Sequence, residues 1–221
     1  MAEIGIDVSF ASELLQKGRL VGLPTETVYG LAANALDLEA VAKIFEVKNR
    51  PVFDPLIIHT NSIEKVKKFV DCIPLDLELL LRQFSPGPLT VLLPKSKLIP
   101  DLVTSGLNRV AVRIPKHPLT LELLKGLDFP LAAPSANPFG YISPTSANHV
   151  NRQLGKKIPY ILDGGTCQVG LESTIIGFEE GKLTIYRKGG LPLEAIEKLV
   201  GKVYLKEHSS SNPAAPGMLK S

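Results

Sequence analysis

The chain has 221 residues, 44% of them hydrophobic and 21% charged, and its 25 basic and 22 acidic side chains leave a net charge of +3. This composition is typical of a folded globular protein and excludes wholesale disorder. No apolar run is long enough to cross a bilayer, the N-terminus lacks the basic segment of a secretory signal, and only two cysteines occur. We therefore expect a cytoplasmic protein that works without a membrane.

Short apolar runs alternate with helical patterns along the chain, without a fixed-period repeat. Helices are predicted at 9–17, from the N-cap Asp37 to about Asn49, and at 62–70, 75–84, 118–125, 144–154 and 192–200. Strands are predicted at 20–23, 56–59, 89–93, 109–114, 131–133, 160–162, 173–178 and 183–187. This order predicts one α/β domain, built around a twisted sheet, over residues 1–206. Residues 207–221 are rich in Ser, Pro and Ala and predict a linker or tail.

The common signatures of nucleotide, metal and nucleophile chemistry are missing from the sequence. It has no G-x-x-x-x-G-K-[ST] loop, no G-x-G-x-x-G turn, no H-E-x-x-H helix, no Cys/His cluster and no nucleophile elbow. A Ser-His-Asp triad is arithmetically possible with four histidines, but no local pattern supports it. We therefore predict no metal-ligand set and no catalytic nucleophile.

Polar strings instead follow the predicted strands, where ligands bind in open α/β sheets. The segment Pro24-Thr-Glu-Thr-Val-Tyr-Gly30 either holds a small polar ligand or is a turn that caps the next segment. Lys48 and Arg50 suit a polyphosphate, although cations are also favoured at a helix C-terminus for its dipole alone. His59, at the end of a strand, is either a structural hydrogen-bonding group or part of a site.

Two further patterns favour a site. Arg109 and Arg113 share one face of a strand, which is costly unless they meet carboxylates or phosphates. The small residues of 132–137 let a ligand approach backbone N–H groups closely. The strings 143–145, 172–174 and 187–190 are, taken singly, ordinary turns.

Together and in this order, these segments resemble the threonylcarbamoyl-AMP synthase family, whose module is the YrdC-type domain. The resemblance is carried by residues 24–31, 48–51, 55–59, 85–90, 110–115, 132–137, 163–165, 172–176 and Arg187. It covers about residues 8–206 and implies an open, twisted, mixed sheet flanked by helices, with a large basic concave cavity.

The implied activity uses L-threonine, bicarbonate and ATP to form threonylcarbamoyl-adenylate and pyrophosphate. Other proteins then transfer the threonylcarbamoyl group to the adenosine next to the anticodon of tRNA, so tRNA or these transferase proteins are the implied partners. Mg²⁺ is expected to accompany ATP. The reaction needs positioning rather than an enzyme nucleophile, which agrees with the absence of a nucleophile signature.

The resemblance also assigns residues to each substrate. The threonine site is expected to contain Thr27, His59, Arg113, Ala133 through its backbone, and Ser173. The nucleotide site is expected to contain Lys48, Arg50, Asp54, Arg109, Ser135, Asn137, Ser143 and Arg187. Arg113 would pair with the amino acid's carboxylate. Asp54 stands where the family commonly has asparagine, so a carboxylate there requires a cation or metal beside it.

Residues 215–218 resemble the opening of the linker that joins a second domain in longer members and lies over their active site. We therefore expect a catalytic domain belonging to a longer protein. Two alternatives remain from the sequence: a double-stranded RNA-binding module, and a hydrolase of the same fold. The small aromatic content and low net charge disfavour RNA stacking, and Lys48-x-Arg50 with Ser135-x-Asn137 favours synthesis.

Overall fold

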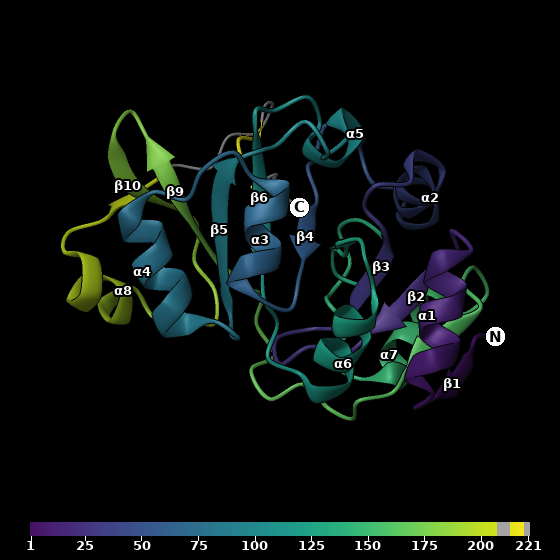
Figure 1. Cartoon of the computed structure of the whole chain (residues 1–221). Coiled ribbons are helices and arrows are strands. Elements are labelled where there is room, and N and C mark those ends of the chain that lie inside the picture. The colour runs from purple at the N-terminus through teal and green to yellow at the C-terminus, as the bar shows by residue number, and fades with distance from the viewer. Residues whose placement is uncertain (207–212, 219–221) are drawn as a thin grey trace.

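The computed structural model describes residues 1–206 and 213–218. Its strands form one open sheet in the order β1–β8–β2–β3–β7–β4–β6–β5–β9–β10–β11, which Figure 1 displays with β10 and β1 at opposite sides. The strands are β1 (Glu3–Gly5), β2 (Val21–Leu23), β3 (Gly30–Asn34), β4 (Ile57–His59), β5 (Leu89–Pro94), β6 (Arg109–Arg113), β7 (Leu131–Ala132), β8 (Tyr160–Leu162), β9 (Thr174–Glu179), β10 (Lys182–Arg187) and β11 (Tyr204–Leu205). Parallel and antiparallel pairs occur in the same sheet. The prediction of an open mixed sheet is confirmed.

Helices flank this sheet and bury their apolar faces against it. They are α1 (Val8–Gln16), α2 (Leu38–Lys48), α3 (Ile63–Phe69), α4 (Leu75–Phe84), α5 (Asp101–Thr104), α6 (Pro118–Gly126), α7 (Ala147–Leu154) and α8 (Leu193–Val200). In Figure 1, α4 lies beside α8 at one end of the sheet, and α1 lies beside α6 at the other. Within the described ranges, no helix combines the length and hydrophobicity that a bilayer crossing requires.

The centre of the sheet brings three polar segments to one place. β4 pairs in parallel with β6, so that His59 lies opposite Arg113. On its other side β4 pairs with β7, which leads directly into the small residues of 133–137. Because these strands are buried and hydrogen-bonded to one another, the residues at their ends are held in fixed positions around the same space.

The start of α2 is capped as the sequence predicts. Asp37 Oδ1 accepts hydrogen bonds from the backbone N–H groups of Glu39 and Ala40, at 3.0 and 3.2 Å. The helix ends at Lys48, and the capping residue Asn49 adopts a left-handed conformation with φ of 51°. The short helix therefore delivers Lys48 and Arg50 to the same side of the sheet as His59.

Replacing Asp37 with alanine is expected to lower the free energy of unfolding by about 1 kcal/mol, because two N–H groups at the start of α2 lose their acceptor. Urea unfolding measures this change. Asp37→Asn, which keeps the side-chain oxygen, should lose much less, and an equal loss in both variants would contradict capping as the cause.

The predicted tail is described only in part, since residues 207–212 and 219–221, with His208 among them, lie outside the described residues. Ala215 and Met218 are fully buried against Ile57, Ile175 and Tyr186. The Gly217 N–H donates to Asp54 Oδ1 at 3.4 Å. Residues 213–218 therefore pack against the sheet at the ends of the polar segments.

Candidate functional site

Two adjoining cavities lie where the polar segments meet. The smaller one, of about 70 Å³, is lined by Thr25, Val28, Gly30, Arg50, Pro55, Ile57, His59, Arg113, Ala133, Pro134, Ser135, Glu172, Ser173, Arg187, Pro216 and Gly217. The larger one, of about 390 Å³, is lined by Lys48, Arg50, Asp54, Ser135, Asn137, Phe139, Gly140, Tyr141, Ile142, Ser143, Glu172 and Gly217. Arg50, Ser135, Glu172 and Gly217 line both cavities, so the two spaces share a wall. The larger volume falls within the range of small-molecule sites.

The residues predicted for threonine gather at the small cavity, with one exception. His59, Arg113, Ala133 and Ser173 all line it. Thr27 does not: its side chain is fully buried, and its Oγ1 lies 2.9 Å from Thr25 Oγ1. Thr25 lines the cavity in its place.

The segment 24–30 is also the turn that the sequence allowed as the alternative interpretation. Thr25 Oγ1 accepts hydrogen bonds from the N–H groups of Thr27 and Val28 and donates to the Val28 carbonyl. The same hydroxyl group therefore both shapes the turn and contributes to the wall of the small cavity.

Most residues predicted for the nucleotide gather at the large cavity. Its lining includes Lys48, Arg50, Asp54, Ser135, Asn137 and Ser143, whereas Arg187 lines the small cavity beside it. The exception is Arg109, which lines neither. Its guanidinium donates to the Phe178 carbonyl and to the Tyr186 hydroxyl, and pairs with Glu179 at 3.5 Å. Arg109 stands four residues before Arg113, roughly 13 Å along an extended strand, and in this structure it forms a structural ion pair outside the lining of both cavities.

Lys48 is buried, with an exposed fraction of 1%. Its Nζ donates to the backbone carbonyl of Ser135 at 2.5 Å and to that of Asn137. Burial, with a further contribution from the charge of Arg50, lowers the pKa of Lys48 to about 7. The amine therefore ties α2 to the 135–137 segment and titrates near neutral pH.

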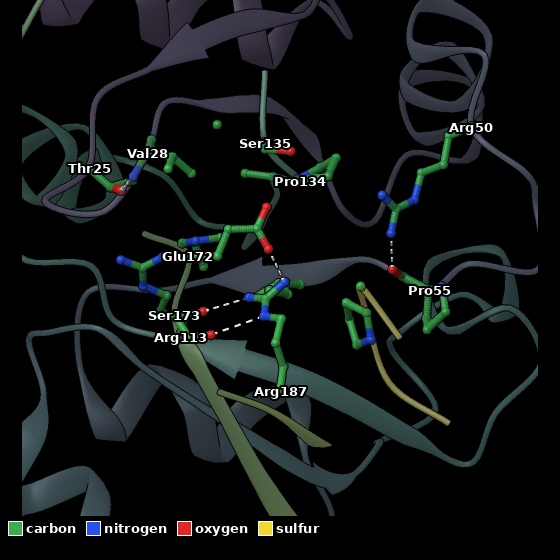
Figure 2. A pocket seen from close by; sticks show the side chains of 16 residues that line it. Thr25, Val28, Arg50, Pro55, Arg113, Pro134, Ser135, Glu172, Ser173 and Arg187 are labelled. Atoms are coloured by element: carbon green, nitrogen blue, oxygen red, sulfur yellow. Dashed lines mark hydrogen bonds and ion pairs between the residues drawn. The ribbon is translucent and has the colours of Figure 1, made fainter. Parts of the chain in front are cut away.

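Arg50 supplies the cation that the sequence required beside Asp54. Its Nη2 lies 2.8 Å from Asp54 Oδ2, and the two side chains are 8% and 1% exposed. The same guanidinium donates to the backbone carbonyls of Asp54 and Pro55, at 3.1 and 2.8 Å. Figure 2 shows the bond from Arg50 to Pro55 at the edge of the small cavity.

Glu172 occupies the wall between the cavities. Its carboxylate pairs with Arg187 and accepts a hydrogen bond from Ser143 Oγ at 3.1 Å. Burial raises the pKa of Glu172, but the charge of Arg187 and the Ser143 hydrogen bond outweigh it and hold this pKa below its usual range. Arg187 also donates to the Ser173 carbonyl and hydroxyl, each at 3.0 Å, as Figure 2 shows.

Behind the wall of the small cavity, Glu26 contacts Arg113; the sequence placed it in segment 24–30 but gave it no role of its own. Arg113 Nη2 donates to Glu26 Oε1 at 2.8 Å, and both side chains are buried. Burial and the nearby charge of Arg113 lower the pKa of His59 to about 3, so its imidazole is neutral. The sequence offers one signal for Glu26 and Glu172: each adjoins hydroxyl residues in a polar string beside a strand.

The described residues contain no cluster of three or more His, Cys, Asp or Glu side chains that could hold a metal ion. The cations and hydroxyl groups that line the cavities can bind and orient a polar or anionic ligand.

Comparison with known proteins places this geometry in a family. A family model for Sua5, YciO and YrdC, described as "Telomere recombination", matches residues 13–189. Proteins called threonylcarbamoyl-AMP synthase are 47% identical in Pyrococcus abyssi and 40% identical in Bacillus subtilis, each over 96% of this chain. The chain spans 63% and 62% of the lengths of those two relatives.

A solved structure agrees with these relatives. The crystal structure of P. abyssi Sua5 complexed with L-threonine superimposes with a TM-score of 0.96 at 44% identity, covering 99% of this chain and 68% of that one. Both the sequence match and the fold extend over the segments that build the two cavities. This chain therefore belongs to the Sua5/YciO/YrdC family.

Proposed function

We propose that this chain forms L-threonylcarbamoyl-adenylate from L-threonine, bicarbonate and ATP, with release of pyrophosphate. One observation carries the proposal: most of the residues expected to bind the amino acid and most of those expected to bind the nucleotide line two cavities with a common wall. Relatives called threonylcarbamoyl-AMP synthase and a relative crystallised with L-threonine support it.

The reaction joins the two substrates across that wall. Bicarbonate gives CO₂ and hydroxide, and this hydroxide takes one proton from the threonine ammonium group to form water. The free amine then adds to CO₂ and releases a second proton, which gives a carbamate. A carbamate oxygen attacks the α-phosphorus of ATP, the bond from that phosphorus to the bridging oxygen breaks, and pyrophosphate leaves. Lys48, Arg50 and Arg187, which line the cavities, would stabilise charge on the transferred and departing phosphates.

The threonine carboxylate would meet Arg113, and the neutral His59 would offer a hydrogen bond without adding charge. Four cations and two carboxylates line the cavities in the described part of the chain, which supports the expected basic character. The small volume between buried walls favours exclusion of water from the labile carbamate.

Mg²⁺ would arrive with ATP and would be held chiefly by phosphate oxygens. Asp54 and Glu172 are the carboxylates of the large cavity, and each is already paired with an arginine. We therefore assign no resident metal ligand.

The proposal has three further parts. The catalytic domain comprises residues 1–206, the protein acts in the cytoplasm, and other proteins transfer its product to tRNA.

Pyrophosphate release from ATP, measured with purified protein, tests the proposal. Release is expected only when L-threonine and bicarbonate are both present, with a threonylcarbamoyl-adenylate mass in the products. Release that continues unchanged when threonine is omitted would contradict the synthase assignment. Salt-sensitive RNA binding that ATP does not affect would favour the RNA-binding alternative.

A further inference from the structure

Arg113 lines the small cavity, and the side chain behind it, Glu26, is one of two groups that bind its guanidinium. Glu26 Oε1 accepts from Arg113 Nη2 at 2.8 Å, and the Gly87 carbonyl accepts from Arg113 Nε at 3.3 Å. These two bonds hold one edge of the planar guanidinium, so its orientation is fixed. No bond to the described residues engages Nη1, which is the amino group left for a ligand.

The second carboxylate oxygen of Glu26 accepts a hydrogen bond from the backbone just after β6, the strand that carries Arg113. Glu26 Oε2 accepts from the Lys116 N–H at 2.9 Å, and the backbone carbonyl of Glu26 accepts from the Val169 N–H at 2.8 Å. The carboxylate thus serves two donors at once. An amide at this position has one acceptor oxygen and would turn its NH₂ group toward one of those donors.

Glu26 itself is not part of the lining of either cavity, and its exposed fraction is 6%. Among the groups that the Glu26 carboxylate contacts, Arg113 is the one that lines a cavity, and it is therefore the direct connection from Glu26 to a bound amino acid. The pair is also electrically neutral as a unit, which suits a zwitterionic amino acid, whereas Lys48, which pairs with no carboxylate among the described residues, lines the large cavity.

We propose that Glu26 is a positioning residue for the amino-acid substrate: through Arg113, it fixes the guanidinium edge that receives the substrate carboxylate. The proposal rests on the proposed function, since L-threonine is the amino acid that the small cavity is expected to take. Glu26 sets the affinity for threonine and leaves the affinity for ATP unchanged.

Calorimetric titration of Glu26→Gln with L-threonine, and separately with ATP, tests this. The Kd for threonine is expected to rise at least tenfold, and the Kd for ATP to stay within twofold of the unaltered protein. At saturating threonine, kcat should be largely kept while KM for threonine rises. In an Arg113→Gln background, Glu26→Gln should raise the threonine Kd by less than a further factor of two, because the arginine through which Glu26 acts is absent.

Glu179→Gln is the matched control. Glu179 of β9 pairs at 3.5 Å with Arg109, which lies on the same strand as Arg113, and neither residue of this pair lines a cavity. Neither affinity should therefore change. Circular dichroism verifies folding. If Glu26→Gln does not fold, Glu26→Asp replaces it with the same expected split, since it keeps the charge but withdraws the carboxylate by one methylene.

Three results would overturn the inference. Glu26→Gln could leave the threonine affinity unchanged, or it could lower the threonine and ATP affinities equally. It could also raise the threonine Kd as much in the Arg113→Gln background as it does in the unaltered protein. Failure of the unaltered protein to bind threonine is a different result. It would contradict the proposed function itself and would be seen before any variant is compared.

Discussion

Replacing Arg50 with alanine is expected to destabilise the fold by about 3–5 kcal/mol, because it leaves the Asp54 carboxylate buried without a cation. The pair lies at 2.8 Å, with side chains 8% and 1% exposed. Arg50 also holds the carbonyls of Asp54 and Pro55, directly before β4. The variant should further weaken ATP binding by about 1.5–3 kcal/mol if the guanidinium makes a charged hydrogen bond to a phosphate.

Urea unfolding separates the structural part of this effect. Arg50→Ala/Asp54→Ala should recover part of the stability, since no unpaired charge then remains, but it should not recover ATP affinity. Arg82→Ala is the matched control, because Arg82 and Glu78 form an exposed pair with the same i,i+4 spacing. That variant should change stability little. A double variant no more stable than Arg50→Ala would show that burial of Asp54 is not the source of the loss.

The sequence predicted the long periodic elements well, because burial of one helix face or of a whole strand leaves a clear pattern. It missed β3, a strand of Gly30-Leu-Ala-Ala-Asn34. These small residues show no alternation, and they are buried because β3 lies between β2 and β7 in the middle of the sheet. It also missed β1, whose three residues pair with Tyr160–Leu162, far away in the sequence.

The candidate site was predictable where one element carries several of its residues. Lys48 and Arg50 follow from a single helix end, and Ser135 and Asn137 from a single loop. Pairing between distant residues was not predictable: Arg113 and Glu26 are 87 positions apart. Strand alternation placed Arg109 and Arg113 on one face, but it gave no information about which end of the strand reaches the cavities.

The unfolding free energy is expected to rise with pH between about 7 and 8.5, and much of this rise should disappear in Lys48→Met. Burial lowers the pKa of Lys48 from 10.5 to about 7 in the folded chain. Above pH 7 the unfolded chain therefore still binds this proton, whereas the folded chain has released it. The unfolded state then binds more protons, so stability increases with pH.

The pH window isolates this lysine from the other shifted groups. His59, whose pKa falls from 6.5 to about 3 on folding, contributes mainly below pH 7, and what it adds above pH 7 is the same in both proteins. Burial raises the pKa of Cys167 from 9.0 to about 11. This shift makes the unfolding free energy fall as the pH rises, but mainly near and above pH 9.0. Urea unfolding at pH 7.0, 7.75 and 8.5 should give a difference in slope between the two proteins approaching ~1.4 kcal/mol per pH unit, the value for one proton. Parallel slopes would mean that Lys48 keeps its proton in the folded chain, held by the carbonyls of Ser135 and Asn137, and that it meets the nucleotide as a permanent cation.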